Sequence, residues 1–163
     1  MFIITLKLNV IKKNTRTLLG IFIKNITMTD RSLKLLEIRP VVGSAKIGPN
    51  MSEEELFQNK TLRPILKLQN DLLLASFQRY IIRGKNRFHE LKKEDRLNYI
   101  SNAIQKDIKY RNTLKGMILG QFTLEEYKIY AENSSALNKR IMSMAVKRLQ
   151  DQLQFFEEPS LVQ

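Results

Sequence analysis

The sequence predicts an all-α protein: an antiparallel bundle of three long helices that follows an extended, basic N-terminal arm. Apolar residues recur at helical spacing along three stretches after residue 50, and helix start and stop signals separate these stretches. No segment after residue 50 alternates in the manner of a β-strand over a strand's length. Long amphipathic helices joined by short connectors are typical of an antiparallel bundle.

The predicted arm, residues 1–50, differs in charge from the rest of the chain. It holds nine of the 28 basic residues but two of the 16 acidic ones, and the net charge of the chain is +12. Its apolar runs are shorter than the roughly 20 residues that span a bilayer, and their order does not fit a signal peptide. We expect the arm to be flexible or partly docked on the helical domain, and Met28 and Met51 are candidates for the true translation start. Over residues 28–50 an extended linker is predicted from Pro40, Gly43, Gly48 and Pro49.

The first long helix is predicted over residues 62–83. Ser52, followed by three glutamates, indicates a separate helix of one or two turns before it. Thr61 is expected to cap the long helix, with Pro64 in its first turn, and Gly84 is expected to end it. The buried face predicted from the spacing consists of Leu62, Ile65, Leu66, Leu72, Leu73, Phe77, Tyr80 and Ile81.

A basic connector, residues 85–93, leads to the second long helix, which is predicted from near Lys93 to Gly120. Its predicted buried stripe consists of Leu97, Ile100, Ile104, Ile108, Leu114 and Ile118. Because this stripe matches those of the other helices, we interpret the segment as a core helix.

The third long helix is predicted from Leu124 towards Phe156. Thr123 and Glu126 form a capping box at its start, and Asn133-Ser134-Ser135 is expected either to kink the helix or to divide it. The predicted domains are therefore the arm, a helical bundle domain over residues 51–157, and a disordered tail over residues 158–163. The apolar positions of this helix are Tyr127, Tyr130, Ala131, Leu137, Ile141, Ala145, Leu149, Leu153 and Phe156.

Asp107 and Arg111 lie one helical turn apart, on or beside the apolar stripe of the second helix. One hypothesis is a buried pair that binds a small charged ligand or transfers a proton. The favoured hypothesis is a polar contact between helices, which satisfies buried polar groups and fixes helix register. The candidate interhelical polar cluster consists of Gln69, Asp107, Arg111, Ser134 and Asn138.

A basic patch surrounds the first connector between long helices. Its cations could contact phosphates while Phe88 stacks on a base, although charged connectors are more often simply solvated. No helix-turn-helix spacing or single-strand-binding signature accompanies the patch. The patch consists of Arg79, Arg83, Lys85, Arg87, Lys92, Lys93 and Arg96.

Several chemistries are not supported by these residues. The chain has no Cys, which excludes disulfides, thiolate metal sites and cysteine nucleophiles. His89 is the single His, so no second one is available for a catalytic pair or a metal cluster. There is no phosphate loop or nucleophile elbow. We therefore expect no cofactor and no metal, and we assign no catalytic residue.

Three runs of the chain resemble a small helical bacterial family: LFQNKTLRPILKLQNDLLLASF, IQKDIKYRNTLKGMILGQFTLEEY and NSSALNKR. The resemblance covers most of residues 54–153. Some members are labelled glyoxalase, so the resemblance implies a glyoxalase-type activity, although the family has no established one. The metal ligands of glyoxalases cannot be placed on this chain, so no catalytic residue is carried over.

The leading hypothesis is a non-enzymatic, cytoplasmic helical bundle that acts by self-association, as a homodimer, or through a protein partner. It is motivated by complete amphipathic helices without a convergent catalytic set. The first alternative is a nucleic-acid-associated protein that uses the basic connector, residues 79–96. The second is a glyoxalase-type lyase, by the family label alone. No transmembrane segment is expected.

Overall fold

The computed structural model describes residues 29–43 and 47–157, and the regular structure in them is helical, which confirms the all-α class. The chain forms two compact units, residues 1–34 and 35–163. In the first unit the description begins at residue 29. Helix α2, Asp30–Glu37, crosses the boundary between the units.

Helix α2 corrects the prediction of an extended linker over residues 28–50. Thr29 caps its start, because the Thr29 hydroxyl accepts a hydrogen bond from the Ser32 backbone N–H at 3.2 Å. Asp30 in the first turn adds a negative charge where the helix dipole favours one. Residues 38–43 and 47–52, which follow this helix in the described part of the chain, form no regular secondary structure.

The prediction of a first long helix over residues 62–83 is wrong at its start and in its middle. Helix α3, Glu53–Phe57, continues through a π-helical segment, Gln58–Leu62, into α4, Arg63–Leu68. Thr61 therefore lies inside a helix rather than capping one. Pro64, which has no N–H to donate, follows the π-helical segment, where the α-helical bonding pattern is already interrupted.

Helix α5, Asn70–Arg83, starts after a break at Gln69, whose ψ of 7° is not helical. The break changes the phase of the buried face. Leu72 is exposed, whereas Leu74 is buried. The predicted end at Gly84 is confirmed, because Gly84 is the C-terminal cap of α5.

The second predicted helix is also divided. Helix α6, Lys93–Lys106, and helix α7, Ile108–Leu119, meet at Asp107, whose backbone is extended with a ψ of 98°. The side chain of Asp107 accepts a hydrogen bond from the Tyr110 backbone N–H at 3.0 Å and so caps α7. Ile108 is exposed as a result, although the spacing predicts it to be buried.

The third predicted helix divides at Asn133 into α8, Leu124–Glu132, and α9, Ser134–Gln150. The capping box of Thr123 and Glu126 at its start is confirmed. A short 3-10 helix, Leu153–Phe156, follows α9. Because all three predicted long helices are divided, a bundle of three long helices does not describe the second unit.

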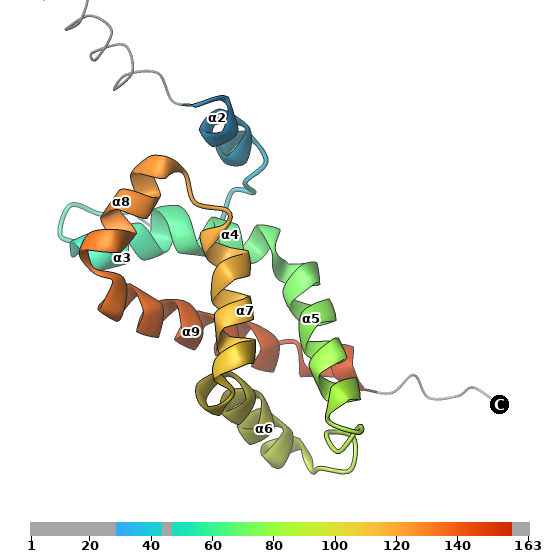
Figure 1. The fold of residues 1–163 in the computed structure, drawn as a ribbon. Helices are drawn as coiled ribbons and strands as arrows, with labels where there is room; N and C mark the ends of the chain where they lie inside the picture. Colours follow the sequence, from blue (N-terminus) through green and yellow to red (C-terminus); the bar gives the residue numbers. More distant parts are fainter. Residues whose placement is uncertain (1–28, 44–46, 158–163) are drawn as a thin grey trace, which may run out of the picture. The chain divides into compact units, whose positions relative to one another are not determined.

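Helix α9 is the central element of this unit and packs against α5, α6, α7 and α8 (Figure 1). Helices α5 and α7 run beside each other, and α6 lies near one end of the pair. The core beneath them is rich in aromatic rings. Phe77 is fully buried, and its ring lies 4.9 Å from that of Phe156 and 5.8 Å from that of Phe88, measured between centroids. None of the described helices combines the length and apolar character needed to cross a membrane.

Candidate ligand-binding site

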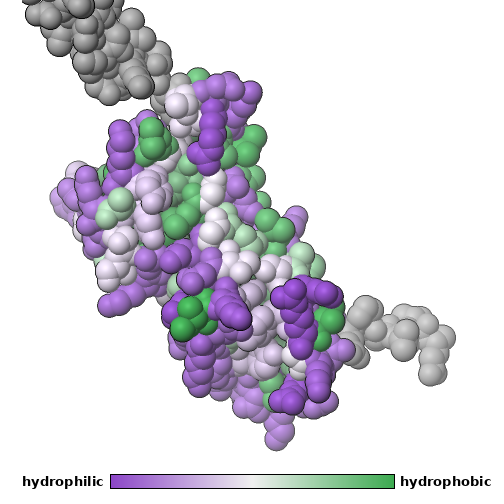
Figure 2. All heavy atoms as spheres, viewed as in Figure 1, coloured by the Kyte–Doolittle hydropathy of each residue, from purple (hydrophilic) through white to green (hydrophobic). Residues whose placement is uncertain are grey.

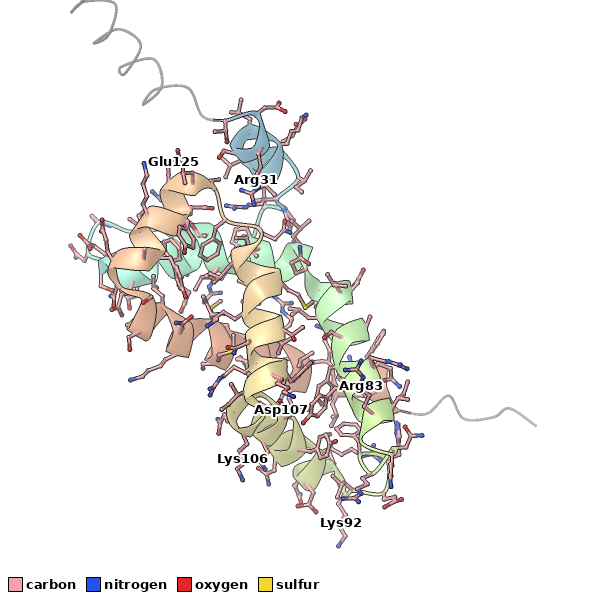
Figure 3. The ribbon with its side chains drawn as sticks, viewed as in Figure 1. Arg31, Arg83, Lys92, Lys106, Asp107 and Glu125 are labelled. Carbon is pink, nitrogen blue, oxygen red and sulfur yellow. The ribbon has the colours of Figure 1, made fainter. Side chains whose placement is uncertain are left out.

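A pocket of about 470 Å³ lies where α5, α6 and α7 meet. Its volume falls within the range of about 300–1,000 Å³ that is typical of small-molecule sites. Arg83 on α5 and Asp107 at the start of α7 belong to opposite sides of it (Figure 3). Its described lining consists of Ser76, Arg79, Tyr80, Arg83, Gly84, Tyr99, Asp107, Lys109, Tyr110 and Thr113.

Three of the chain's five tyrosines line this pocket. The ring centroids of Tyr80 and Tyr110 lie 4.4 Å apart, and the ring of Tyr99 meets that of Tyr80 edge-on at 6.3 Å. Phe77 lies within 6.4 Å of all three rings and joins them to the aromatic core. Each of the three tyrosine rings therefore packs against at least two other rings, which restricts its orientation.

Positive charge surrounds this wall. Arg79 and Arg83 are exposed on α5, and Lys109 is exposed on α7. Asp107 is the one acid among the described lining residues. The surface between α5 and α7 has intermediate hydropathy and is bordered by strongly hydrophilic residues (Figure 2). Such a site favours an anionic ligand that also carries a flat apolar part.

Asp107 is fixed by its role as the cap of α7. Its Oδ1 atom accepts from the Tyr110 backbone N–H, and its half-buried carboxylate lines the pocket. Burial raises the pKa of Tyr80, and the negative charge of Asp107 raises it further. The Tyr80 hydroxyl therefore stays protonated at neutral pH, and its hydrogen-bond interaction with the Asp107 carboxylate raises the pKa as well.

The Tyr110 hydroxyl is the buried polar group of the described pocket lining that lacks a hydrogen-bond partner of normal geometry. The Tyr110 side chain is 8% exposed, and its buried hydroxyl makes no hydrogen bond of normal geometry with the described protein, although Ser76 is close enough to influence it. Burial raises the pKa of Tyr110 well above its ordinary value, so the hydroxyl is neutral. A buried polar group without a partner costs free energy and is uncommon in native proteins. A ligand in the pocket can supply the missing partner.

Gly84 shapes the α5 end of the pocket. A Cβ atom at this position would lie 2.7 Å from the Tyr99 hydroxyl and 3.3 Å from the Ile81 carbonyl oxygen. The φ of Gly84 is −77°, which any residue can adopt. A larger residue here would therefore have to move the Tyr99 hydroxyl, whereas the backbone conformation itself does not call for glycine.

The structure does not gather the predicted polar cluster into one place. Asp107 and Arg111 form no ion pair; Arg111 donates instead to the Gln105 carbonyl oxygen at 3.1 Å. Asn138 accepts from the Tyr130 hydroxyl at 2.9 Å. Gln69 lies at the break between α4 and α5, and Ser134 lies at the start of α9.

Arg111 and Asn138 do share a second pocket, of about 520 Å³, between α6, α7 and α9. Lys115 and Lys139 also line it, over a floor that includes Met142. This pocket is cationic, but no aromatic ring and no buried unpartnered group belongs to its described lining. It offers less to a specific ligand than the pocket beside α5.

The predicted basic patch is divided among different surroundings. Arg79 and Arg83 line the tyrosine pocket, Lys93 lines a separate groove, and Lys85 has a positive φ of 59° in the exposed connector. Arg96 donates to the His89 carbonyl oxygen at 2.8 Å and lies over the Phe88 ring. The other members, Arg87 and Lys92, are exposed in the connector.

Phe88 itself is fully buried, so the expectation that it stacks on a base is wrong. The rings that are open to a ligand are those of Tyr80, which the spacing predicts to be buried, and Tyr99, to which the sequence assigns no role. Arg79, Arg83 and Asp107 are candidates that the sequence names, whereas Tyr110, Lys109 and Thr113 were also missed. Their only signal is that three tyrosines recur near cations, and their convergence depends on the break at Asp107.

Within the described residues, no group of three or more His, Cys, Asp and Glu side chains is placed to hold a metal ion. Comparisons of the chain with protein families, with curated proteins and with solved structures found no match. The glyoxalase-type activity implied by the sequence resemblance therefore stays a prediction.

Proposed function

We propose that this chain is a non-catalytic binding protein whose ligand is anionic and carries an aromatic ring. The observation that supports the proposal is the pocket beside α5, where Tyr80, Tyr99 and Tyr110 lie among Arg79, Arg83 and Lys109. Aromatic side chains stack on flat rings, and cations bind phosphate or carboxylate groups. The proposal retains the nucleic-acid alternative but moves the aromatic contact from Phe88 to the tyrosines.

The net charge of +12 adds a long-range attraction for such a ligand. Arg79 and Arg83 lie one turn apart on α5 and can contact one anionic group together, because residues four apart are neighbours on a helix. Asp107 reduces the positive charge of the pocket without cancelling it. Binding is therefore expected to weaken as salt is added.

Isothermal titration calorimetry with a nucleoside monophosphate, its parent nucleoside and inorganic phosphate tests the proposal. The monophosphate should bind more tightly than either of its parts, because ring and anion are held together. Arg83→Gln should weaken its binding about tenfold, as expected when a charge-assisted hydrogen bond is lost. Lys128→Gln, which removes an exposed cation of α8 outside the described pocket lining, should leave binding unchanged.

Two outcomes would overturn the proposal. One is that none of the four common nucleoside monophosphates binds. The other is an equal loss of binding in Arg83→Gln and Lys128→Gln, which would show that overall charge, and not the pocket, attracts the ligand.

A second candidate function, self-association, is supported by a different surface. On α8 the side chains of Leu124, Tyr127 and Ile129 are each at least half exposed. Apolar side chains gathered on one short helix favour contact with another protein surface. Light scattering should then give a dimer mass that Tyr127→Ser reduces and that Phe155→Ser, at another exposed aromatic residue, does not. A monomer mass for the unaltered chain would remove this candidate.

A further inference from the structure

We infer that the ring taken by the tyrosine pocket is guanine, recognised through Asp107, so that the ligand is a guanosine nucleotide. The nucleotide is either free or one residue of a single-stranded nucleic acid, and both present the same base and phosphate. This inference rests on the proposed function and adds the identity of the ring.

Asp107 supports this inference through its position and its chemistry. It is the one acid among the described residues that line the pocket, and its backbone and side chain are fixed as the cap of α7. An ionised carboxylate accepts hydrogen bonds and donates none, and its contacts with the Tyr110 N–H and with the Tyr80 hydroxyl leave about half of its four lone-pair sites free. A neutral ring that binds here must therefore present N–H donors to it.

The bases differ in the pattern of hydrogen-bond donors that they present to a carboxylate. Guanine carries two neighbouring donors on one edge, the ring N1–H and the exocyclic N2 amino group, and these match the two oxygens of a carboxylate. Adenine and cytosine place a ring nitrogen acceptor beside their amino group, and uracil flanks its N3–H with two carbonyl oxygens. A carboxylate is repelled by those acceptors, so it discriminates in favour of guanine.

The tyrosines and arginines of the pocket suit the ring face and the phosphate of a nucleotide. Tyr80 and Tyr99 offer aromatic surface for stacking, which contributes to base binding without distinguishing one base from another. The hydroxyl of Tyr110 is more than nine-tenths buried, lines the pocket and has no partner of normal geometry in the described protein. Arg79 and Arg83 supply the cations for a phosphate.

Asp107→Asn is the informative substitution. Asn caps helices as well as Asp does, so α7 keeps its start. The Asn side chain has an amino group in place of one acceptor oxygen. It can therefore no longer accept hydrogen bonds from two neighbouring donors at once. The variant should therefore keep its fold and bind phosphate at least as tightly, because a negative charge is removed from a cationic pocket, while it loses its preference among bases.

The test compares guanosine, inosine and adenosine monophosphates by calorimetry on the full chain. Guanosine monophosphate should bind about tenfold more tightly than adenosine monophosphate, and inosine monophosphate, which lacks the N2 amino group, should lie between them. Asp107→Asn should bring the three affinities within about twofold of one another. Asp95→Asn, an exposed position of α6 outside the described pocket lining, should preserve the order.

The source of the nucleotide is tested with a short single-stranded oligonucleotide that contains one guanosine. If it competes more strongly than guanosine monophosphate, the ligand is a nucleic acid; if it competes less strongly, the ligand is the free nucleotide. Equal affinity for all bases in the unaltered chain would overturn the inference while leaving the proposed function in place. A guanine preference that survives Asp107→Asn would also overturn it, because another group would then recognise the base.

Discussion

Arg39 and Glu126 lie 87 residues apart in the sequence and form a bidentate ion pair, with N–O distances of 2.5 and 2.7 Å. Their side chains are 6% and 14% exposed. Arg39 also donates to the Gln121 carbonyl oxygen, and Thr61 donates to Glu126 at 2.9 Å. Glu126 thereby joins the start of α8 both to the chain after α2 and to the π-helical segment before α4.

Arg39→Ala should destabilise the fold, because it leaves the Glu126 carboxylate largely buried without its cation. Breaking a buried ion pair costs about 3–5 kcal/mol, and the partial exposure of this pair places the expected loss near the lower figure. Urea unfolding followed by circular dichroism measures it. Lys147→Ala is the matched control, because the Lys147–Asp151 pair is exposed and should contribute under about 1 kcal/mol. Equal losses in both variants would contradict the role given to Arg39.

The same pair should make stability depend on pH. Burial of Glu126 opposes ionisation, but the hydrogen bonds from Arg39, Thr123 and Thr61 and the charge of Arg39 outweigh it and lower the pKa below 4.5. A carboxyl whose pKa is lower in the folded state contributes stability above its unfolded pKa and loses it as the pH falls through the folded pKa. The free energy of unfolding should therefore fall below pH 4.5. The Glu126→Gln variant has no carboxyl group at this position. Its free energy of unfolding should therefore fall less below pH 4.5 than that of the unaltered chain.

The sequence predicts the helical class and much of the core of this protein. Ile100, Ile104, Leu114 and Ile118 are buried as their spacing predicts. The capping box at Thr123 and the stop at Gly84 are also confirmed. These features are local, because a cap or an apolar stripe is specified within a few residues.

The candidate site could not be predicted in the same way. Asp107 lies within continuous helical spacing, so the sequence reads as one helix, yet its side chain competes for the Tyr110 N–H and starts a new helix. That break brings Tyr110 beside Tyr80, which lies 30 residues earlier in the chain. The Arg39–Glu126 pair depends in the same way on tertiary packing and has no local signal.

Gly84→Ala should weaken the free energy of ligand binding by more than it lowers the free energy of unfolding. The new Cβ must displace the Tyr99 hydroxyl, which lies 2.7 Å away, and so narrows the pocket. Gly116→Ala is the control, since nothing outside the helix's own backbone lies within 4 Å of its Cβ position in the last turn of α7. That control should raise the free energy of unfolding by about 0.5–1 kcal/mol through helix propensity. Calorimetry and urea unfolding of both variants check this, and unchanged binding by Gly84→Ala would count against a ligand beside Tyr99.

Tyr110→Phe should weaken ligand binding without lowering the stability of the fold. Removing a buried hydroxyl that makes no hydrogen bond of normal geometry with the described residues relieves a desolvation cost, so the variant should be as stable as the unaltered chain or more stable by about 1 kcal/mol. Its affinity for a guanosine nucleotide should fall, because the ligand loses a hydrogen bond. Thermal unfolding and calorimetry measure the two effects. A variant that is less stable and binds equally well would mean that the hydroxyl serves the fold and not a ligand.

The most direct test of the central claim is a titration of the isotopically labelled protein with guanosine monophosphate, followed by two-dimensional amide NMR. The account predicts that the largest shifts fall on the C-terminal half of α5, on Tyr99 and on residues 107–113. Shifts that gather instead around Lys115 and Lys139, at the second cationic pocket, would contradict it, as would a spectrum that does not change.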